Sequence, residues 1–229
     1  MCGRYSLAVS PEALRETFGV DDIAPDVTPR YTIAPQTPVL AIGRSVEGHL
    51  RAGMLRWGLV PWWAKDPSAG QRMINARAES LTQKPAFREA FERRRCLIAA
   101  DGFYEWRREG GRKVPMRIRL PDAGPFGFAG IWERWRNPEG ERLFSCAIVT
   151  VDANDALRPI HNRMPVILDA ADRDAWLDPT RSTDELLGLL RPYAGKLEVY
   201  EVSPLVNAAV NDDPACFEPV RREEQGVIS

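Results

Sequence analysis

The sequence predicts one α+β domain built on a curved, barrel-like and mostly antiparallel β-sheet with helices inserted between the strands. Three observations point to this fold. Apolar segments of strand length recur along most of the 229-residue chain, with Gly, Pro and Asp turn signals between them. Only a few segments carry apolar residues at helical spacing. The sequence contains no repeat, no low-complexity tract and no linker long enough to divide it into two domains.

The first sixty residues predict one short helix and a β-hairpin. Ser10 is a favourable N-cap residue and Pro11 suits the first turn, so we expect a helix to begin there. Residues 20–36 are rich in Asp, Pro and Thr, and this composition predicts an irregular surface segment. Two strands joined by a turn at Glu47 and Gly48 are expected at residues 37–44 and 50–60.

The middle of the chain predicts a second helix followed by a β-hairpin. Residues 84–95 favour a helix because Phe87 and Phe91 lie four residues apart on one face. A turn at residues 108–111 is followed by alternating apolar and arginine side chains, which is typical of a half-buried strand. The strands expected here are residues 96–100, 103–107 and 114–120.

The last part of the chain predicts four further strands and two short helices. Ser182 and Glu185 have the spacing of a capping box, which favours a helix start at this point. The domain is expected to span residues 2–215, with a polar tail over residues 216–229. The predicted helices are residues 170–177 and 183–190, and the predicted strands are residues 126–135, 142–151, 164–168 and 197–202.

Composition and charge exclude several classes of protein. The 31 basic and 32 acidic residues give a net charge of −1, which excludes nucleic-acid binding through bulk positive charge but not a local basic groove. No apolar run approaches the about 18 residues that cross a bilayer, and the N-terminus lacks a signal peptide. Four cysteines in such a chain predict free thiols and a cytoplasmic location. With two histidines and no Cys/His cluster, we expect neither a metal site nor a cofactor.

Cys2 is the first candidate for chemistry. Its small side chain allows removal of Met1, which would leave an α-amine and a thiol on adjacent carbons. Both groups are nucleophilic near neutral pH. Such an aminothiol condenses with an aldehyde to an imine, and the thiol then closes a thiazolidine ring. The alternative is that position 2 merely tolerates a cysteine.

Three polar residues with apolar or aromatic neighbours are further candidates. Glu105 lies between two aromatic residues, where burial would favour a general acid or base; alternatively, it is a half-exposed carboxylate paired with Arg107. His161 is expected on a loop before a strand, either as a catalytic group or as a structural histidine. Asn75 needs a hydrogen-bond partner in its apolar surroundings. His49, next to a turn, is expected to be a surface residue.

Taken together, these residues fall in motifs of a known family. The chain resembles the SOS-response-associated peptidase (SRAP) family of abasic site processing proteins over roughly residues 2–215, with the motifs in the order expected. No motif position departs from the pattern, and Asn162, often Asp in relatives, is expected to matter little. The motifs are MCGRY (residues 1–5), RWGLVP (56–61), NARAE (75–79), GFYEW (102–106) and HNRMP (161–165).

The resemblance implies the SRAP fold and a covalent link to DNA. Members of the family shield abasic sites in single-stranded DNA through a thiazolidine between the N-terminal cysteine and the sugar aldehyde. By similarity, Cys2 is the nucleophile, His161 acts at the sugar ring oxygen, Glu105 moves the protons, and Asn75 holds Cys2. The family label also implies a self-processing peptidase activity, and an imine intermediate would permit β-elimination as a lyase side reaction.

A DNA groove is expected beside these motifs. Arginines within two residues of the proposed catalytic residues could clamp phosphates, and nearby tryptophans could stack on bases. The alternative for tryptophans is the core, which we expect for Trp57 and Trp132. The expected partner is single-stranded DNA with abasic sites, at plain strands or at single-strand/double-strand junctions, bound by a monomer. The predicted DNA-binding residues are Arg4, Arg77, Arg163, Trp62, Trp63 and Trp106.

Two other functions stay open at this point. The chain could be an amidohydrolase or autopeptidase in which Cys2 attacks a carbonyl and its own amine serves as the base. It could also be a non-covalent single-strand-binding module in which the Arg and Trp residues bind and Cys2 is incidental. The first predicts turnover of an amide without a bond to DNA, and the second predicts binding that ignores the lesion.

Overall fold

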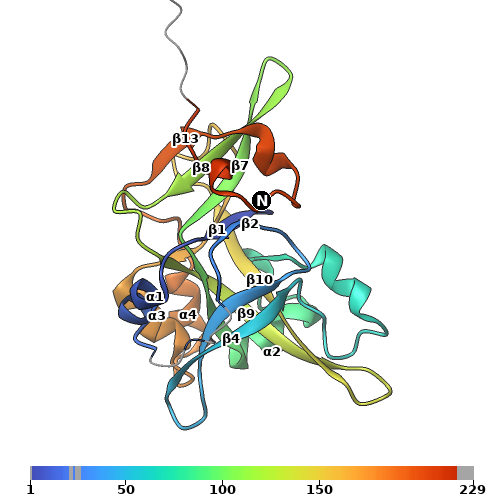
Figure 1. The fold of residues 1–229 in the computed structure, drawn as a ribbon. Coiled ribbons are helices and arrows are strands. Elements are labelled where there is room, and N and C mark those ends of the chain that lie inside the picture. The colour runs from blue at the N-terminus through green and yellow to red at the C-terminus, as the bar shows by residue number, and fades with distance from the viewer. Residues whose placement is uncertain (1, 21–22, 24–26, 221–229) are drawn as a thin grey trace, which may run out of the picture.

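The larger part of the fold is a β-barrel, seen in the lower half of Figure 1. The structure, a computed structural model, describes residues 2–20, 23 and 27–220. Antiparallel pairing links four strands in the order β4, β3, β6 and β9, and β10 then pairs with β9 on one side and β4 on the other. The β4–β10 pairing is parallel. The barrel strands are β3 (Pro38–Arg44), β4 (Leu50–Trp57), β6 (Arg95–Ala100), β9 (Phe126–Arg136) and β10 (Arg142–Asp152).

A second sheet of five antiparallel strands stands above the barrel, in the order β13, β8, β7, β1 and β2 (Figure 1). The chain passes from β6 of the barrel into β7 of this sheet through Asp101 alone, so the two sheets are joined directly. This architecture confirms the predicted α+β fold with a barrel-like sheet. The strands are β1 (Tyr5–Leu7), β2 (Arg30–Ile33), β7 (Gly102–Glu109), β8 (Arg112–Arg119) and β13 (Glu198–Glu201).

The four predicted helices are present, and the caps expected at Ser10 and Ser182 are formed. The Ser10 side chain accepts a hydrogen bond from the N–H of Ala13, and Ser182 and Glu185 form the complete capping box. No helix in the described part of the chain is long and apolar enough to cross a membrane. The α-helices are α1 (Pro11–Phe18), α2 (Pro85–Arg93), α3 (Ala170–Leu177) and α4 (Thr183–Leu189), and the short 3₁₀ turns are η1 (Pro67–Arg72), η2 (Ala78–Ser80), η3 (Pro204–Asn207) and η4 (Pro214–Cys216).

Five short strands differ from the prediction or were absent from it. β2 lies inside residues 20–36, which were expected to be irregular, and β1 and β5 (Asn75–Arg77) were not predicted. The expected strand at residues 164–168 is divided into β11 (Arg163–Pro165) and β12 (Ile167–Leu168). Val166 lies between them because its N–H bonds to Val149 on β10 while its carbonyl accepts from Ala129 on β9.

The core fills the barrel and the space beneath the second sheet. Tyr5 of β1 packs edge-on against the buried ring of Trp57, with ring centroids 5.2 Å apart. Trp57 is therefore a core residue as predicted, whereas Trp132 is only partly buried. A smaller cluster beneath the C-terminal segment contains Tyr104 and the fully buried Cys216, so the packed chain extends past residue 215.

Candidate active site

Strand β1, which lies between β7 and β2, carries the N-terminal residues along β7. Tyr5 faces Phe103 in the register, and the N–H of Tyr104 donates a hydrogen bond to the Arg4 carbonyl at 2.9 Å. Because the two strands are antiparallel, the chain before Arg4 runs toward Glu105 and Trp106. Cys2 is fully buried there, and its Sγ lies 3.9 Å from the Arg4 carbonyl oxygen. The pairing of β1 with β7 therefore places Cys2 beside the predicted acid or base.

Glu105 is buried rather than half-exposed. Its side chain leaves the β7–β8 hairpin opposite Met116 and is 6% exposed. Burial raises the pKa of the Cys2 thiol well above its usual range, and the charge of Glu105 raises this pKa further. The thiol is consequently protonated at neutral pH and becomes a nucleophile only when a base removes its proton.

Asn75 holds Cys2 from the barrel side. β5 lies parallel to β10, with Asn75 opposite Ile148. The Asn75 Nδ2 donates a hydrogen bond to the Cys2 carbonyl at 2.8 Å. Its Oδ1 is buried and has no hydrogen-bond partner among the residues that the structure describes. Asn75 thus fixes the Cys2 backbone and keeps one acceptor available to a ligand.

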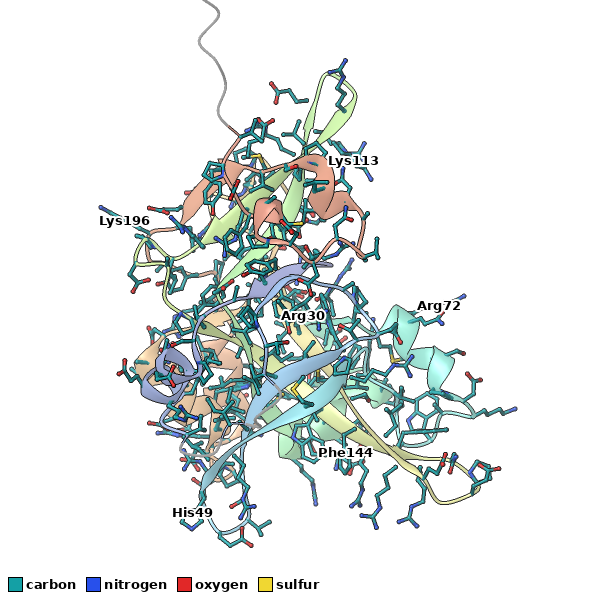
Figure 2. The ribbon with its side chains drawn as sticks, viewed as in Figure 1. Arg30, His49, Arg72, Lys113, Phe144 and Lys196 are labelled. Carbon is teal, nitrogen blue, oxygen red and sulfur yellow. The ribbon has the colours of Figure 1, made fainter. Side chains whose placement is uncertain are left out.

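His161 ends a turn just before β11. Its N–H donates to the Leu157 carbonyl at 2.9 Å, and its Nδ1 accepts a hydrogen bond from the backbone N–H of Arg163 at 3.0 Å. In the neutral ring this leaves the proton on Nε2. His161 lines a cavity of about 420 Å³ with Arg77, the second residue after Asn75. The other histidine, His49, is exposed at the tip of the β3–β4 hairpin, as expected (Figure 2).

Strand β10 brings these segments together. Thr150 of β10 faces Arg77 of β5 on one side and Pro165 of β11 on the other. The Asn75 and His161 motifs are therefore neighbours in the fold although they are far apart in the sequence. Thr150 is itself fully buried, and its hydroxyl has no hydrogen-bond partner in the described part of the chain. Thr150 was not among the predicted site residues, and its one signal in the sequence is a polar side chain within a continuous apolar strand.

The predicted arginines have different environments. Arg77 is exposed at the cavity beside His161. Arg4 is half-buried, its Nη1 donates to the Val206 carbonyl at 2.9 Å, and burial lowers the pKa of its guanidinium. Both side chains come from the segments that carry Asn75 and Cys2, which suits a contact with the flanking phosphates.

Arg163 has a structural environment instead. Its Nη1 and Nη2 bind the two carboxylate oxygens of Glu79 at 2.7 and 3.0 Å. Nη1 also binds Asp152 at 2.8 Å, and Nη2 donates to the Thr150 carbonyl at 2.7 Å. The guanidinium is 10% exposed and already bound to two acidic residues. This geometry does not support the predicted phosphate contact, because the fork that would grip a phosphate is occupied.

We expect Arg163→Ala to lower the free energy of unfolding by about 1–3 kcal/mol, because the buried Thr150 carbonyl loses its charged donor. Chemical denaturation measures this change. The matched control is Arg158→Ala, which removes an exposed arginine paired with Asp155 and should cost less than about 0.5 kcal/mol. A phosphate contact would be indicated if Arg163→Ala left stability unchanged but weakened DNA binding and its salt dependence.

The tryptophans also divide into two groups. Trp62 and Trp63, both predicted to bind DNA, follow Pro61 after β4 and are 59% and 52% exposed, so both rings are accessible from solvent. Their loop begins at Gly58, whose φ of 133° favours glycine. A Cβ at this position would lie only 2.6 Å from the Gly70 carbonyl oxygen, so a larger residue would not fit. Trp106 is half-buried, and its Nε1 donates to Asn207 Oδ1 at 2.7 Å.

The described residues provide no group of three or more His, Cys, Asp or Glu side chains placed to bind one metal ion. The side chains that the candidate residues do provide are a buried thiol, a carboxylate, an imidazole and a carboxamide. This set can transfer protons around a nucleophile.

Comparisons with known proteins agree on one family. The family model described as SOS response associated peptidase (SRAP) matches residues 1–209. "Abasic site processing protein YoqW" of Bacillus subtilis (strain 168) is 44% identical over 223 residues, which cover 95% of this chain and 99% of that protein. "Abasic site processing protein HMCES" of Gallus gallus is 33% identical over 266 residues, which cover 96% and 78%. A crystal structure of a Bacteroides thetaiotaomicron protein matches with a TM-score of 0.86 at 27% identity, covering 96% and 100%.

Proposed function

Since this chain belongs to the SOS response associated peptidase (SRAP) family, we propose that it processes abasic sites by linking itself covalently to single-stranded DNA through a thiazolidine at Cys2. One observation carries this proposal: β1 places the buried thiol of Cys2 where the charge of Glu105 acts on it, and Asn75 holds the Cys2 carbonyl. Two relatives that align with 95% and 96% of this chain are named for abasic site processing. Their names support abasic DNA as the substrate of this protein.

The reaction begins once Met1 has been removed. The Cys2 amine attacks the C1′ aldehyde carbon of the opened sugar, and loss of one water leaves an imine. The thiol sulfur then attacks the imine carbon, a C–S bond forms, and the thiol proton is transferred to the nitrogen. The two steps together release one water molecule, and they require neither an oxidant nor a reductant. Burial raises the pKa of the thiol, so the sulfur stays protonated during the first step and the amine is expected to react before it.

Three side chains assist these steps. The Nδ1 of His161 accepts from a backbone N–H, so the neutral ring carries its proton on Nε2, and this nitrogen donates to the sugar ring oxygen when the hemiacetal opens. Glu105 accepts the thiol proton and returns it to nitrogen, and the reverse transfer would make the link reversible. The buried Oδ1 of Asn75 accepts a hydrogen bond from the amine or from a sugar hydroxyl.

The DNA strand is held beside this site by charge and stacking. Arg4 and Arg77 bind the flanking phosphates, while Trp62, Trp63 and Trp106 offer rings to unpaired bases. A net charge of −1 gives the protein little attraction to intact duplex DNA. Stable attachment to DNA therefore depends on the covalent step at the abasic site. The proposed location is the cytoplasm, where a monomer meets single strands or single-strand/double-strand junctions; autopeptidase and lyase activities are proposed as side reactions.

A denaturing gel tests the proposed function. The protein without Met1 is incubated with an oligonucleotide that carries one abasic site and with an undamaged oligonucleotide of the same sequence. We expect a heat-stable shifted band with the abasic strand alone. Turnover of an amide substrate without a shifted band would favour the amidohydrolase. Equal non-covalent binding to both strands without a band would favour the single-strand-binding module.

We expect replacement of both Trp62 and Trp63 by Ala to weaken the non-covalent affinity for undamaged single-stranded DNA by roughly fivefold or more, because each stacked base contributes about 1–3 kcal/mol. Fluorescence anisotropy measures this affinity. Phe144→Ala is the matched control, since Phe144 is also an exposed aromatic residue (40%) and lies on the lower side of the barrel (Figure 2). Equal losses in both variants would contradict a specific stacking role for the loop.

A further inference from the structure

The C-terminal segment crosses the N-terminal end of β1 and is fixed at both of its ends. We call residues 203–212 the C-terminal strap. Before the strap, the N–H of Val202 donates to the Pro115 carbonyl at 3.1 Å, and Val202 bridges to Pro219. At its other end, the Asp212 carboxylate accepts hydrogen bonds from the side chain of Arg30 and from the backbone N–H of Thr32 on β2. Figure 1 shows this red segment beside β1.

Two consecutive strap residues bind two of the proposed DNA-binding side chains. The Val206 carbonyl accepts a hydrogen bond from Arg4 Nη1 at 2.9 Å, and the Asn207 Oδ1 accepts one from Trp106 Nε1 at 2.7 Å. Val206 is fully buried, so its backbone is fixed by packing against Tyr104 in the small core cluster. Asn207 is exposed and follows it directly. The strap therefore contacts the edge of the proposed DNA groove through the buried Val206 and through the side-chain oxygen of the exposed Asn207.

We propose that Asn207 is a positioning residue, which holds the indole of Trp106 in the plane required to stack on a DNA base. This inference rests on the proposed function, because Trp106 is one of the residues proposed there to bind DNA. An indole has a single polar group, its Nε1–H. Bonding that group to a strap fixed at both ends orders the ring before DNA arrives, so less conformational entropy is lost on binding.

A double-mutant cycle with Asn207→Ala and Trp106→Phe tests this role. Phe keeps an aromatic ring but lacks the Nε1–H. We expect Asn207→Ala to weaken affinity for single-stranded DNA, and the crosslinking rate at limiting protein, by about twofold to tenfold in the native background. In the Trp106→Phe background the same substitution should change neither. Asn137→Ala, in the β9–β10 hairpin, removes another side-chain hydrogen bond and should leave both quantities unchanged.

Fluorine NMR of protein labelled with fluorinated tryptophan provides a readout independent of DNA. The resonance that is lost in Trp106→Phe belongs to Trp106. This resonance should shift or broaden in Asn207→Ala and stay in place in Asn137→Ala. The proposal is overturned if Asn207→Ala leaves the Trp106 resonance unchanged, or if it weakens binding equally in both backgrounds. Either result leaves the crosslinking of the native protein intact, whereas failure of the proposed function would remove that crosslinking.

Discussion

Cys2→Ser is expected to abolish the heat-stable crosslink to abasic DNA while preserving a transient bond that borohydride can trap. Serine at this position still allows removal of Met1, so the amine remains and forms an imine with the sugar aldehyde. A hydroxyl is a far weaker nucleophile than a thiol and does not close a stable ring. Denaturing gels run with and without borohydride measure both species. The native protein should give a band in both lanes and the variant only after reduction.

Cys96→Ala is the matched control for this loss. Cys96 is also buried, and burial likewise raises the pKa of its thiol, but it lies on β6 inside the barrel. Its removal should leave the crosslinked fraction at saturation unchanged. A stable band from Cys2→Ser, or an equal loss in Cys96→Ala, would contradict the assignment of the sulfur to Cys2.

An N-terminal extension that is retained should abolish crosslinking as completely as loss of the thiol. With any residue before Cys2, its nitrogen is part of an amide, whose lone pair is delocalised into the carbonyl and does not attack an aldehyde. The thiol alone gives only a reversible adduct. The measurement compares a tagged protein with the same protein after a protease has released Cys2 as the first residue.

The cleaved protein is the control, since it comes from the same preparation and differs from the tagged one only in the absence of the extension. Crosslinking should be absent before cleavage and restored to the native level after it. Equal crosslinking before and after cleavage would show that the amine is not required and would exclude a thiazolidine.

Much of the fold could be predicted from the sequence, and the exceptions have physical reasons. The long barrel strands were found because continuous and alternating apolar patterns last over many residues. The strands β1, β2 and β5 contain three or four residues, which is too short for such a pattern. Their pairing depends on neighbours supplied by distant segments, such as β7 for β1 and β10 for β5.

The candidate site was predictable where chemistry is carried by a motif and less so where it depends on tertiary contacts. Cys2 and Asn75 were singled out separately, and the structure joins them by a hydrogen bond. Arg163 resembled a phosphate ligand because its position beside His161 is visible in the sequence, whereas its pairing with Glu79 and Asp152 is not. The link from Asn207 to Trp106 spans 101 residues and has no local signal.

The intact mass of the protein after incubation with abasic single-stranded DNA tests the covalent mechanism most directly. We expect a species whose mass equals that of the protein without Met1 plus that of the oligonucleotide, less one water. This species should be absent with undamaged DNA. Two separate masses, or a summed mass without the loss of water, would contradict a thiazolidine at Cys2.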